Sequence, residues 1–557
     1  LVRRMVGIET SGSISTLFSD KTGTITKGNL EVVGLVLGNG KTIRNKDDLV
    51  GSPKLNYLIS ENMILNNEAK LSDDGTVLGG NITDKALMNY AKSKKVTARI
   101  IDQKYFSSSL KYSSVSIDDG IVHELIKGAP EVLLPNVKEI YNEQGRREYV
   151  DKAELEKQLK KYTSMGYRVI MLADKLRLDS EDLVFMCLVL LKDEVSANAS
   201  KAVAMIEKAN VHTVMITGDA LDTSINIGRE IGLLKSEDDV VLTSSELGKM
   251  SDDEVKTIYK KIRIIARALP TDKSRLVRIG QSMGEVVGMT GDGVNDAPAL
   301  KCADVGFAMG SGSEVSKEAA DIVILDNDLL SIGKAILYGR TIFKSIRKFV
   351  IFQLMMNLCA LTLSILGPFL NINTPITVMQ MLWINMIMDT FAGLAFSFEP
   401  PLEEYMYEKP IKKDEQIINK YMYSSIAVTG VYTALLLILF LKMPIFKDLF
   451  RLAVDDKYLM TAFFGLFVFS GVVNSFNART NRINILANIE KNKPFIFIIL
   501  FIVIIQIFLL YGGGEIFRTY GLTFKEFVVT LLLSFTVLPV DIIRKMIVKK
   551  TKMKTSV

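Results

Sequence analysis

Directly after the apolar run 15–19, the chain reads Asp20-Lys21-Thr22-Gly23-Thr24-Ile25-Thr26. The run predicts a short buried strand, and the glycine-bearing stretch predicts a turn at the carboxyl end of that strand. An aspartate in this place can attack a phosphorus centre and form an acyl phosphate. Lys21 and the N–H groups of the turn can supply positive charge to the phosphoryl oxygens. The stretch therefore indicates phosphoryl transfer with Asp20 as the nucleophile.

Two later stretches repeat this design. The apolar run 213–216 precedes Thr217-Gly218-Asp219, and the run 286–289 precedes Thr290-Gly291-Asp292-Gly293-Val294-Asn295-Asp296. The carboxyl ends of parallel strands meet at one edge of a sheet, so we expect an α/β domain that brings the turns together. Two carboxylates that converge on one phosphate repel it unless a cation lies between them, so such a site also requires Mg²⁺.

The composition of the 557-residue chain changes near Arg340. The whole chain carries 68 basic and 62 acidic side chains, with 48% hydrophobic residues and a mean hydropathy of +0.24. Residues 1–340 hold 45 basic and 48 acidic side chains, whereas residues 341–557 hold 23 and 14. A polar half is thus joined to a basic, very apolar half, which argues against nucleic-acid binding. Two histidines are too few for a His-rich zinc site, and three distant cysteines argue against a disulfide framework.

The apolar half contains six stretches of about 20 residues, the length that crosses a bilayer. We expect membrane spans near 349–370, 376–398, 424–442, 457–474, 494–511 and 526–543. Six spans place both ends of the apolar half on the same side of the membrane. The segments on that side hold 17 Lys and Arg residues, and the loops on the opposite side hold 6. The positive-inside rule then places residues 1–340 in the cytoplasm.

The quoted motifs resemble those of the P-type ATPases, in which the phosphorylated aspartate lies in Asp-Lys-Thr-Gly-Thr. The resemblance implies an α/β haloacid-dehalogenase-like (Rossmann-like) phosphorylation domain, an inserted α+β nucleotide-binding domain and an all-α six-helix membrane domain. Related phosphatases have a general acid/base aspartate two residues after the nucleophile. Thr22 stands at that position here and activates water poorly, which favours a longer-lived aspartyl phosphate.

The resemblance also implies roles for single residues of the phosphorylation domain. Asp20, Thr22 and Asp292 hold Mg²⁺, and Lys273 neutralises the phosphoryl oxygens. The full catalytic set that it implies is Asp20, Lys21, Thr22, Thr217, Gly218, Asp219, Lys273, Asn295 and Asp296.

Residues 31–190 interrupt the strand–turn pattern and resemble the nucleotide-binding domain of the family. Lys127-Gly128-Ala129 matches its Lys-Gly-Ala motif, and Phe106 with Lys111 fits the residues that stack on and lie near adenine. Arg168 fits an arginine that reaches the phosphates of ATP. Asp84 stands where the family usually has a glutamate. Around this insert we expect a linker and the first part of the phosphorylation domain at 1–30, its second part at 191–340, and a transmembrane domain at 341–557.

Polar side chains inside membrane spans mark an ion pathway by default. Asn385 and Asp389 lie four residues apart on one helix, and Asn357 lies on the preceding one. One carboxylate and two amide oxygens suit Ca²⁺. The surrounding sequence is similar to that of plasma-membrane-type calcium pumps. Two-site pumps carry acidic ligands at the positions of Ala360 and Gly471, so we expect one Ca²⁺ per cycle.

By this resemblance the chain corresponds to the C-terminal two-thirds of a pump in the cell membrane. The actuator domain and the first four helices are expected upstream, and the fragment alone is not expected to transport. Three other functions remain open: a pump for Na⁺, H⁺ or Mn²⁺, a membrane-anchored phosphatase of the haloacid-dehalogenase type, and a catalytically silent subunit.

Overall fold

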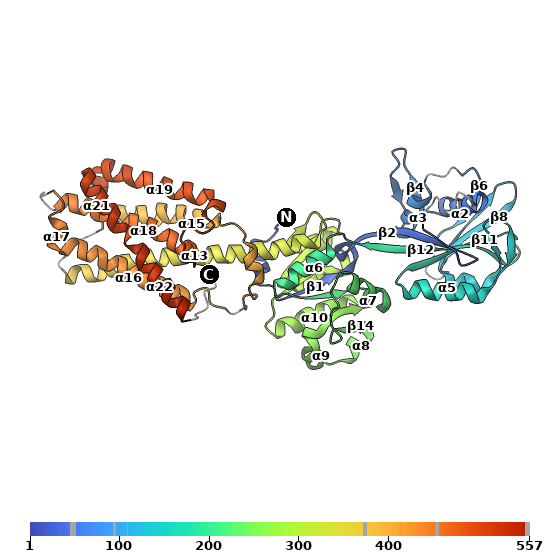
Figure 1. The fold of residues 1–557 in the computed structure, drawn as a ribbon. Helices are drawn as coiled ribbons and strands as arrows, with labels where there is room; N and C mark the ends of the chain where they lie inside the picture. The colour runs from blue at the N-terminus through green and yellow to red at the C-terminus, as the bar shows by residue number, and fades with distance from the viewer. Residues whose placement is uncertain are drawn as a thin grey trace. The chain divides into compact units, whose positions relative to one another are not determined.

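The structure is a computed structural model that describes residues 1–44, 52–92, 96–107, 110–370, 372, 376–413, 415–451 and 456–551. Contacts divide the chain into two units. The first contains residues 1–10 and 14–334, and the second contains residues 11–13 and 335–557. Figure 1 shows the strands gathered in the first unit and long helices in the second.

A seven-stranded sheet forms the centre of the region that carries Asp20, and all of its paired strands are parallel. The first strand of the chain lies in the middle, so Asp20 ends a strand that has a neighbour on each side. In spatial order the strands are β14 (Val240–Thr243), β15 (Ile262–Ala266), β13 (His212–Ile216), β1 (Thr16–Asp20), β16 (Val287–Gly291), β17 (Val305–Met309) and β18 (Ile322–Ile324).

Helices connect these strands, as parallel pairing requires. Every residue of β1 and β16 is buried, which is typical of a parallel sheet covered on both faces. The helices of this region are α1 (Met5–Ser11), α6 (Ala199–Lys208), α7 (Leu221–Glu230), α8 (Ser244–Lys249), α9 (Asp252–Ile258), α10 (Pro270–Ser282), α11 (Ala297–Cys302) and α12 (Glu314–Ala319). This arrangement confirms the predicted Rossmann-like fold.

A second, mostly antiparallel sheet has nine strands and carries the insert. Its strands are β2 (Thr26–Leu37), β3 (Thr42–Ile43), β6 (Arg99–Lys104), β7 (Tyr112–Asp118), β8 (Val122–Gly128), β9 (Val137–Tyr141), β10 (Arg147–Tyr149), β11 (Arg168–Lys175) and β12 (Leu183–Val195). The helices are α2 (Pro53–Leu65), α3 (Ile82–Ala91), α4 (Pro130–Leu133) and α5 (Lys152–Ser164), and a small hairpin joins β4 (Ala69–Leu71) to β5 (Val77–Gly79).

The strands β2 and β12 form one long antiparallel ribbon that leads into and out of the insert. Their pairing runs from Thr26 opposite Val195 to Leu37 opposite Cys187. The predicted limits of the insert, residues 31 and 190, therefore both fall inside this ribbon.

Six helical segments of the second unit are long and apolar enough to cross a membrane, judged on the described residues. They are α13 (Leu329–Phe369), α14 with η6 and α15 (Val378–Ser397), α16 (Lys420–Lys442), α18 (Lys457–Arg479), α19 (Lys493–Gly512), and α21 (Phe524–Phe535) with α22 (Val537–Lys550). Short helices α17 (Pro444–Lys447) and α20 (Gly514–Phe517) lie in the loops. This confirms the all-α membrane part of the predicted fold.

The first of these helices is longer than the sequence indicates. α13 begins at Leu329, so the predicted span start at 349 and the expected domain boundary after Arg340 both lie within it. Hydropathy detects only the part of a helix that suits the bilayer, and the polar turns around Lys344 continue the same helix without a break. The contact-based boundary lies after Lys334.

Candidate active and binding sites

Asp20 is held at the carboxyl end of β1 by three hydrogen bonds. Its N–H donates to Thr290 Oγ1 at 2.9 Å, and its Oδ1 accepts the Lys21 N–H at 2.8 Å. The Lys273 Nζ from α10 lies 3.0 Å from Asp20 Oδ2. The sheet therefore fixes one carboxylate oxygen through the backbone, while the other faces a lysine.

Lys273 joins Asp20 to the third turn of the sheet edge. Its Nζ also lies 2.6 Å from Asp296 Oδ1, and the side chain is 7% exposed. Burial alone would lower the pKa of Lys273, but the charges of Asp20 and Asp296 offset this and raise it. Lys273 thus stays charged, as its predicted role of neutralising phosphoryl oxygens requires.

The carboxylates around Asp20 are too close together to be stable as anions without a further cation. Oxygens of Asp20, Asp292 and Asp296 lie within 4.8 Å of one another. Burial raises the pKa of Asp20 to about 6, with Lys273 opposing and both other aspartates adding to the shift. Burial also raises the pKa of Asp292. An all-oxygen donor set of this charge fits Mg²⁺.

Gly23 allows the turn after Asp20 to approach Asp292. Its backbone has a φ of +68°, which side chains of L-residues rarely adopt. A Cβ atom there would lie 2.6 Å from Asp292 Oδ2. Thr22, the expected third Mg²⁺ ligand, is half-buried in the same turn.

The other residues predicted for this site differ in exposure. Thr217 is buried after β13, and its Oγ1 accepts the Asp219 N–H at 3.1 Å. Gly218 is exposed, and a Cβ there would meet no atom within 4 Å. Asn295 is exposed. The Thr217 turn is thus open for a phosphoryl group to approach.

A cavity of about 570 Å³ in the insert collects all six predicted nucleotide residues. Its lining includes Asp84, Phe106, Lys111, Lys127, Gly128 and Arg168. A volume of this size is typical of a small-molecule site. Phe106 is 52% exposed, so its ring is free to stack on a planar ligand.

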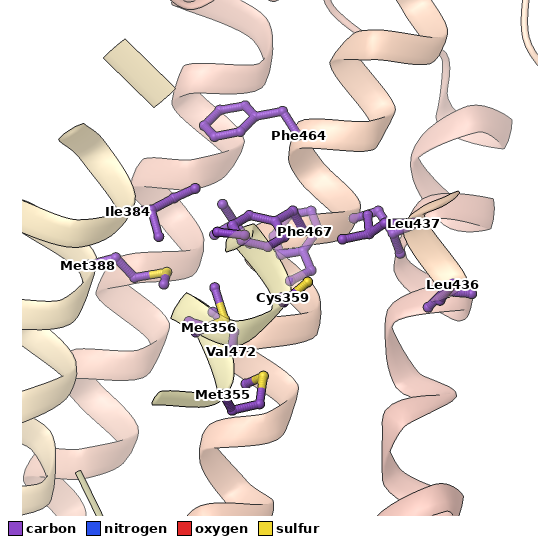
Figure 2. Packing of buried hydrophobic residues seen from close by; sticks show 14 of the residues in the cluster. Met355, Met356, Cys359, Ile384, Met388, Leu436, Leu437, Phe464, Phe467 and Val472 are labelled. Carbon is purple, nitrogen blue, oxygen red and sulfur yellow. The ribbon is translucent and has the colours of Figure 1, made fainter. Parts of the chain in front are cut away.

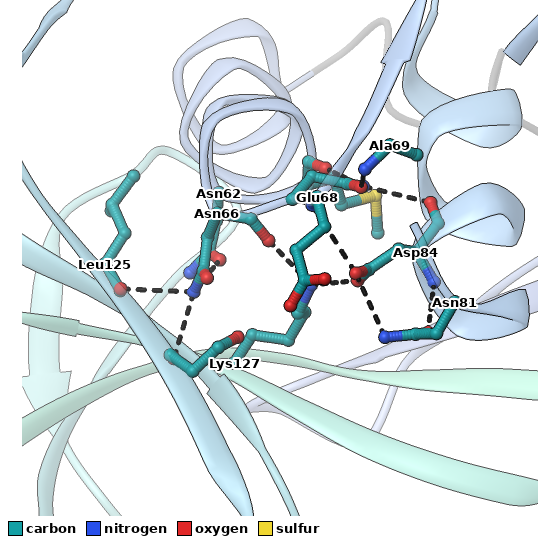
Figure 3. Close-up of polar contacts among 11 residues, drawn as sticks. Asn62, Asn66, Glu68, Ala69, Asn81, Asp84, Leu125 and Lys127 are labelled. Atoms are coloured by element: carbon teal, nitrogen blue, oxygen red, sulfur yellow. Dashed lines mark hydrogen bonds and ion pairs between the residues drawn. The ribbon is translucent and has the colours of Figure 1, made fainter. Parts of the chain in front are cut away.

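Lys127 lies at the buried base of this cavity, where Asp84 holds it. The Lys127 Nζ is 2.5 Å from Asp84 Oδ1 and 2.6 Å from the carbonyl oxygen of Asn66. Asn81 donates to the other oxygen of Asp84 at 3.1 Å (Figure 3). Burial lowers the pKa of Lys127, and the charge of Asp84 opposes this. In this structure Asp84 orients Lys127. The resemblance to the family did not predict this contact.

Two backbone features shape the cavity wall. A Cβ at Gly128 would lie 2.4 Å from the Tyr112 Cβ, so only glycine fits there. Lys111 has a φ of +60°, and its carbonyl oxygen accepts the Ala129 N–H at 3.0 Å. The strand ends that carry Lys111 and Lys127 are therefore held together.

The predicted ion residues lie on two membrane helices. Asn385 lies in a π turn, η6 (Trp383–Met388), between α14 (Val378–Leu382) and α15 (Asp389–Ser397). Such turns are frequent at functional sites. Asp389 is 4% exposed, and its Oδ1 has no hydrogen-bond partner among the described residues. Asn357 and Asn385 are exposed, so their amide groups are available to a ligand.

Apolar side chains pack around Met388, the residue that precedes Asp389 (Figure 2). A Cβ at Gly471 would lie 2.8 Å from the Met356 sulfur, and Met388 also lies within contact distance of it. Ala360 is buried in the same cluster. The two positions at which two-site pumps carry acidic ligands are thus closely packed with carbon and sulfur atoms.

Family models match both halves of the chain. Residues 14–304 match the haloacid dehalogenase-like hydrolases, and residues 277–336 match a second model of that description. Residues 373–547 match the C-terminal region of cation-transporting ATPases. The chain belongs to the P-type cation-transporting ATPases.

Curated relatives match nearly all of this chain. They include calcium-transporting ATPase 12, plasma membrane-type, of Arabidopsis thaliana, which is 34% identical over 91% of the chain and 51% of its own length. A probable calcium-transporting ATPase 6, plasma membrane-type, of Oryza sativa is 32% identical over 98% of the chain and 56% of its own length. Calcium-transporting ATPase PAT1 of Dictyostelium discoideum is 31% identical over 100% of the chain and 55% of its own length. The chain thus spans about half the length of these relatives, less than the expected two-thirds.

Lys21 forms ion pairs with two carboxylates that follow the insert in the sequence. Its Nζ lies 2.8 Å from Asp219 Oδ2 and 3.3 Å from Asp193 Oδ2. The two partners, which lie on segments that follow the insert, neutralise a buried lysine and raise its pKa against the effect of burial. Lys21 thus ties the turn after β1 to β12.

Asp193 is the functional candidate that the sequence reasoning missed. Its carboxylate also accepts hydrogen bonds from Thr26 Oγ1 at 2.6 Å and from the Gly28 N–H at 3.1 Å. It therefore anchors the base of the β2–β12 ribbon. The available signal was the stretch Asp193-Glu194-Val195-Ser196, in which the family usually has Asp-Pro-Pro-Arg and only the aspartate is kept.

Proposed function

We propose that this chain carries the phosphorylation, nucleotide-binding and C-terminal membrane parts of an ATP-driven Ca²⁺ pump. The convergence of Asp20, Lys273 and Asp296 at the edge of the parallel sheet carries this proposal. It supports phosphoryl transfer to Asp20, because a lysine already bound to both carboxylates stands where negative charge would develop.

In this mechanism each residue has a limited task. Asp20 and Asp292, with Thr22 in the same turn, would hold Mg²⁺, which supplies charge neutralisation for the incoming phosphate. Asp20 attacks the γ-phosphorus with its carboxylate oxygen, and ADP leaves. Lys273 and the Thr217-Gly218-Asp219 turn stabilise the phosphoryl oxygens. Thr22 offers no base to activate water, so the aspartyl phosphate persists.

The insert would deliver ATP from the 570 Å³ cavity. Phe106 would stack on adenine, while Lys127 and Arg168 would supply positive charge. The volume of the cavity and the presence of all six expected residues in its lining support this assignment.

Asp389, Asn385 and Asn357 would bind the transported Ca²⁺. The unpartnered oxygen of buried Asp389 supports a cation there, since an unpaired carboxylate is costly inside a membrane. The packed methionines at Gly471 support one ion per cycle. Transport would also need the actuator domain and the first four helices of the family, and a location in the cell membrane.

The test is phosphorylation by labelled ATP with and without Ca²⁺, in the chain alone and joined to any coding sequence that precedes it. Acid-stable, hydroxylamine-sensitive label that requires Ca²⁺ is expected in the longer protein, and Asp20→Asn abolishes it. Asp222→Asn is the matched control, because Asp222 is exposed on α7 of the same domain. Labelling that depends on Na⁺ or Mn²⁺ instead of Ca²⁺ would contradict the assignment of Ca²⁺ as the transported ion. Rapid phosphate release without trapped label would favour a phosphatase.

A further inference from the structure

A second group of metal-ligand side chains lies in the insert, outside the lining of the nucleotide cavity. Glu61 comes from α2, Asp119 from the turn between β7 and β8, and His123 from β8. One ligand atom of each lies within 4.8 Å of the others. Three separate elements thus converge on one point.

Glu61 is fully buried, yet within the part of the chain that the structure describes neither of its carboxylate oxygens has a hydrogen bond of normal geometry. The groups that face it are the Tyr57 hydroxyl, Asp119, His123 and Asp174. A buried carboxylate without a partner is costly, so this site needs either a proton or a cation.

The helix that carries Glu61 cannot easily turn away from this position. The neighbouring Asn62 donates from its Nδ2 to the carbonyl oxygens of Ile126 and Ala173, both at 3.1 Å. These two bonds fix α2 to β8 and β11. The orientation of Glu61 toward His123 is therefore part of the packing of the domain.

The imidazole of His123 is oriented as in many metal sites. Its Nδ1 lies 2.7 Å from Asp174 Oδ1, and the other oxygen of Asp174 accepts the Tyr141 hydroxyl at 2.8 Å. An Nδ1–H that donates to a buried carboxylate leaves the lone pair on Nε2, which faces Asp119 at 3.6 Å. A carboxylate behind the histidine is the usual outer partner of a zinc ligand.

We propose that Glu61, Asp119 and His123 bind one divalent transition-metal ion, with Zn²⁺ as the best fit. Ligand atoms about 2.0–2.2 Å from Zn²⁺ in a tetrahedron lie about 3.3–3.6 Å apart, close to the separation of His123 and Asp119. One imidazole nitrogen with two carboxylates suits Zn²⁺ better than Mg²⁺ or Ca²⁺, which prefer oxygen alone. A single histidine is enough for this site, because the carboxylates of Glu61 and Asp119 supply the other two protein ligands.

The ion would join α2 to the β7–β8 turn and so stabilise the nucleotide-binding part of the protein. The Asp119 side chain is 33% exposed, whereas Glu61 and His123 are buried, so the ion would enter from the side of Asp119. A fourth position on that side is left for water.

The test uses the purified full chain, stripped with a chelator and titrated with Zn²⁺ against a chromophoric competitor. Excess Mg²⁺ in the buffer occupies the carboxylates around Asp20. We expect one tight equivalent, weakened at least about 100-fold in Glu61→Gln and in His123→Gln. Asp174→Asn, which removes only the outer partner, should weaken binding by about 10- to 100-fold. Asp179→Asn, an exposed carboxylate of the same domain, should change nothing.

Zinc K-edge X-ray absorption of the unmutated protein makes the test independent of variant folding. One imidazole and otherwise light oxygen or nitrogen scatterers are expected. A sulfur scatterer, an affinity that Glu61→Gln leaves unchanged, or the absence of a tight equivalent would each overturn the proposal. The last result would mean that a proton, not a metal ion, satisfies Glu61.

Discussion

At the scale of single residues, short contacts decide what the phosphorylation turn can tolerate. Gly23 combines a positive φ with a Cβ position only 2.6 Å from Asp292 Oδ2. Gly232 also has a positive φ, +72°, but a Cβ there meets open space. Comparing substitutions at these two glycines therefore distinguishes the effect of backbone strain from that of displacing the Asp292 carboxylate.

We expect Gly23→Ala to lower the amount of phosphoenzyme by roughly 10- to 100-fold, because misplacing Asp292 by less than 1 Å weakens the positioning of the phosphate. Gly232→Ala should leave the amount of phosphoenzyme within about twofold of that in the unmutated protein, although each substitution costs about 1–2 kcal/mol of backbone strain. Steady-state labelling with ATP measures both variants. Equal losses in the two would mean that strain alone, and not contact with Asp292, explains the glycine.

The ion pair between Asp84 and Lys127 should make nucleotide binding depend on pH. Lys127 is charged below its pKa, which burial lowers and Asp84 raises. Asp84→Asn removes the raising partner, so the pKa of Lys127 falls further and its charge is lost as pH rises.

We therefore expect nucleotide affinity in Asp84→Asn to fall as pH rises, and to start falling at a lower pH than in the unmutated protein, because Lys127 loses its proton more readily without Asp84. Titration with a fluorescent ATP analogue at several pH values measures this. Asp118→Asn, exposed at the end of β7, is the control. Parallel pH profiles for the Asp84 variant and the unmutated protein would contradict the role of Asp84.

At the scale of elements, polar side chains hold the π turn of the second membrane helix. The Trp383 Nε1–H donates to the buried Gln506 Oε1 of α19 at 2.9 Å. Gln380 of α14 donates to the carbonyl oxygen of Phe517 at 2.7 Å. These bonds fix the rotation of the helix that carries Asn385 and Asp389.

The Trp383–Gln506 bond should contribute measurably to stability. A double-mutant cycle with Trp383→Phe and Gln506→Leu should give a coupling energy of about 0.6–1.7 kcal/mol, the range of hydrogen bonds between membrane helices. Thermal unfolding in detergent, followed by a thiol-reactive dye that detects the buried Cys359, provides the measurement. Strictly additive effects of the two substitutions would show that the bond contributes nothing.

At the scale of the whole molecule, six membrane-length helical segments and the distribution of basic residues make a topology prediction. The loops between α13 and α14, between α16 and α18, and between α19 and α21 are expected outside the cell. The loop between α18 and α19, like residues 1–340, is expected in the cytoplasm.

Single cysteines test this arrangement in a Cys302→Ala background, since Cys187 and Cys359 are buried. Lys447→Cys and Glu515→Cys should react with an impermeant maleimide added to intact cells. Asn484→Cys should react only after permeabilisation, because the positive-inside rule keeps its loop in the cytoplasm. All three positions are exposed. Labelling of Asn484→Cys in intact cells would reverse the orientation.

Local pattern in the sequence was sufficient for the elements and for the class of the protein. The strand–turn units at Asp20, Thr217 and Asp292 and the six apolar stretches are visible because periodicity and turn chemistry act over a few residues. The structure bears out the parallel sheet and the six membrane-length helical segments. The start of α13 was missed, because hydropathy describes a helix only where it would meet lipid.

Only the tertiary structure decided which charges meet. Lys273 lies between Asp20 and Asp296, Lys21 turns to Asp219 and Asp193, and Glu61 faces His123. Partners such as Lys21 and Asp193 are far apart in sequence, and no local pattern encodes their distance. Long side chains can reach in several directions, and strand order and helix packing select one of them. The sequence by itself determined the kinds of chemistry available to this protein, and folding determined which groups are close enough to carry it out.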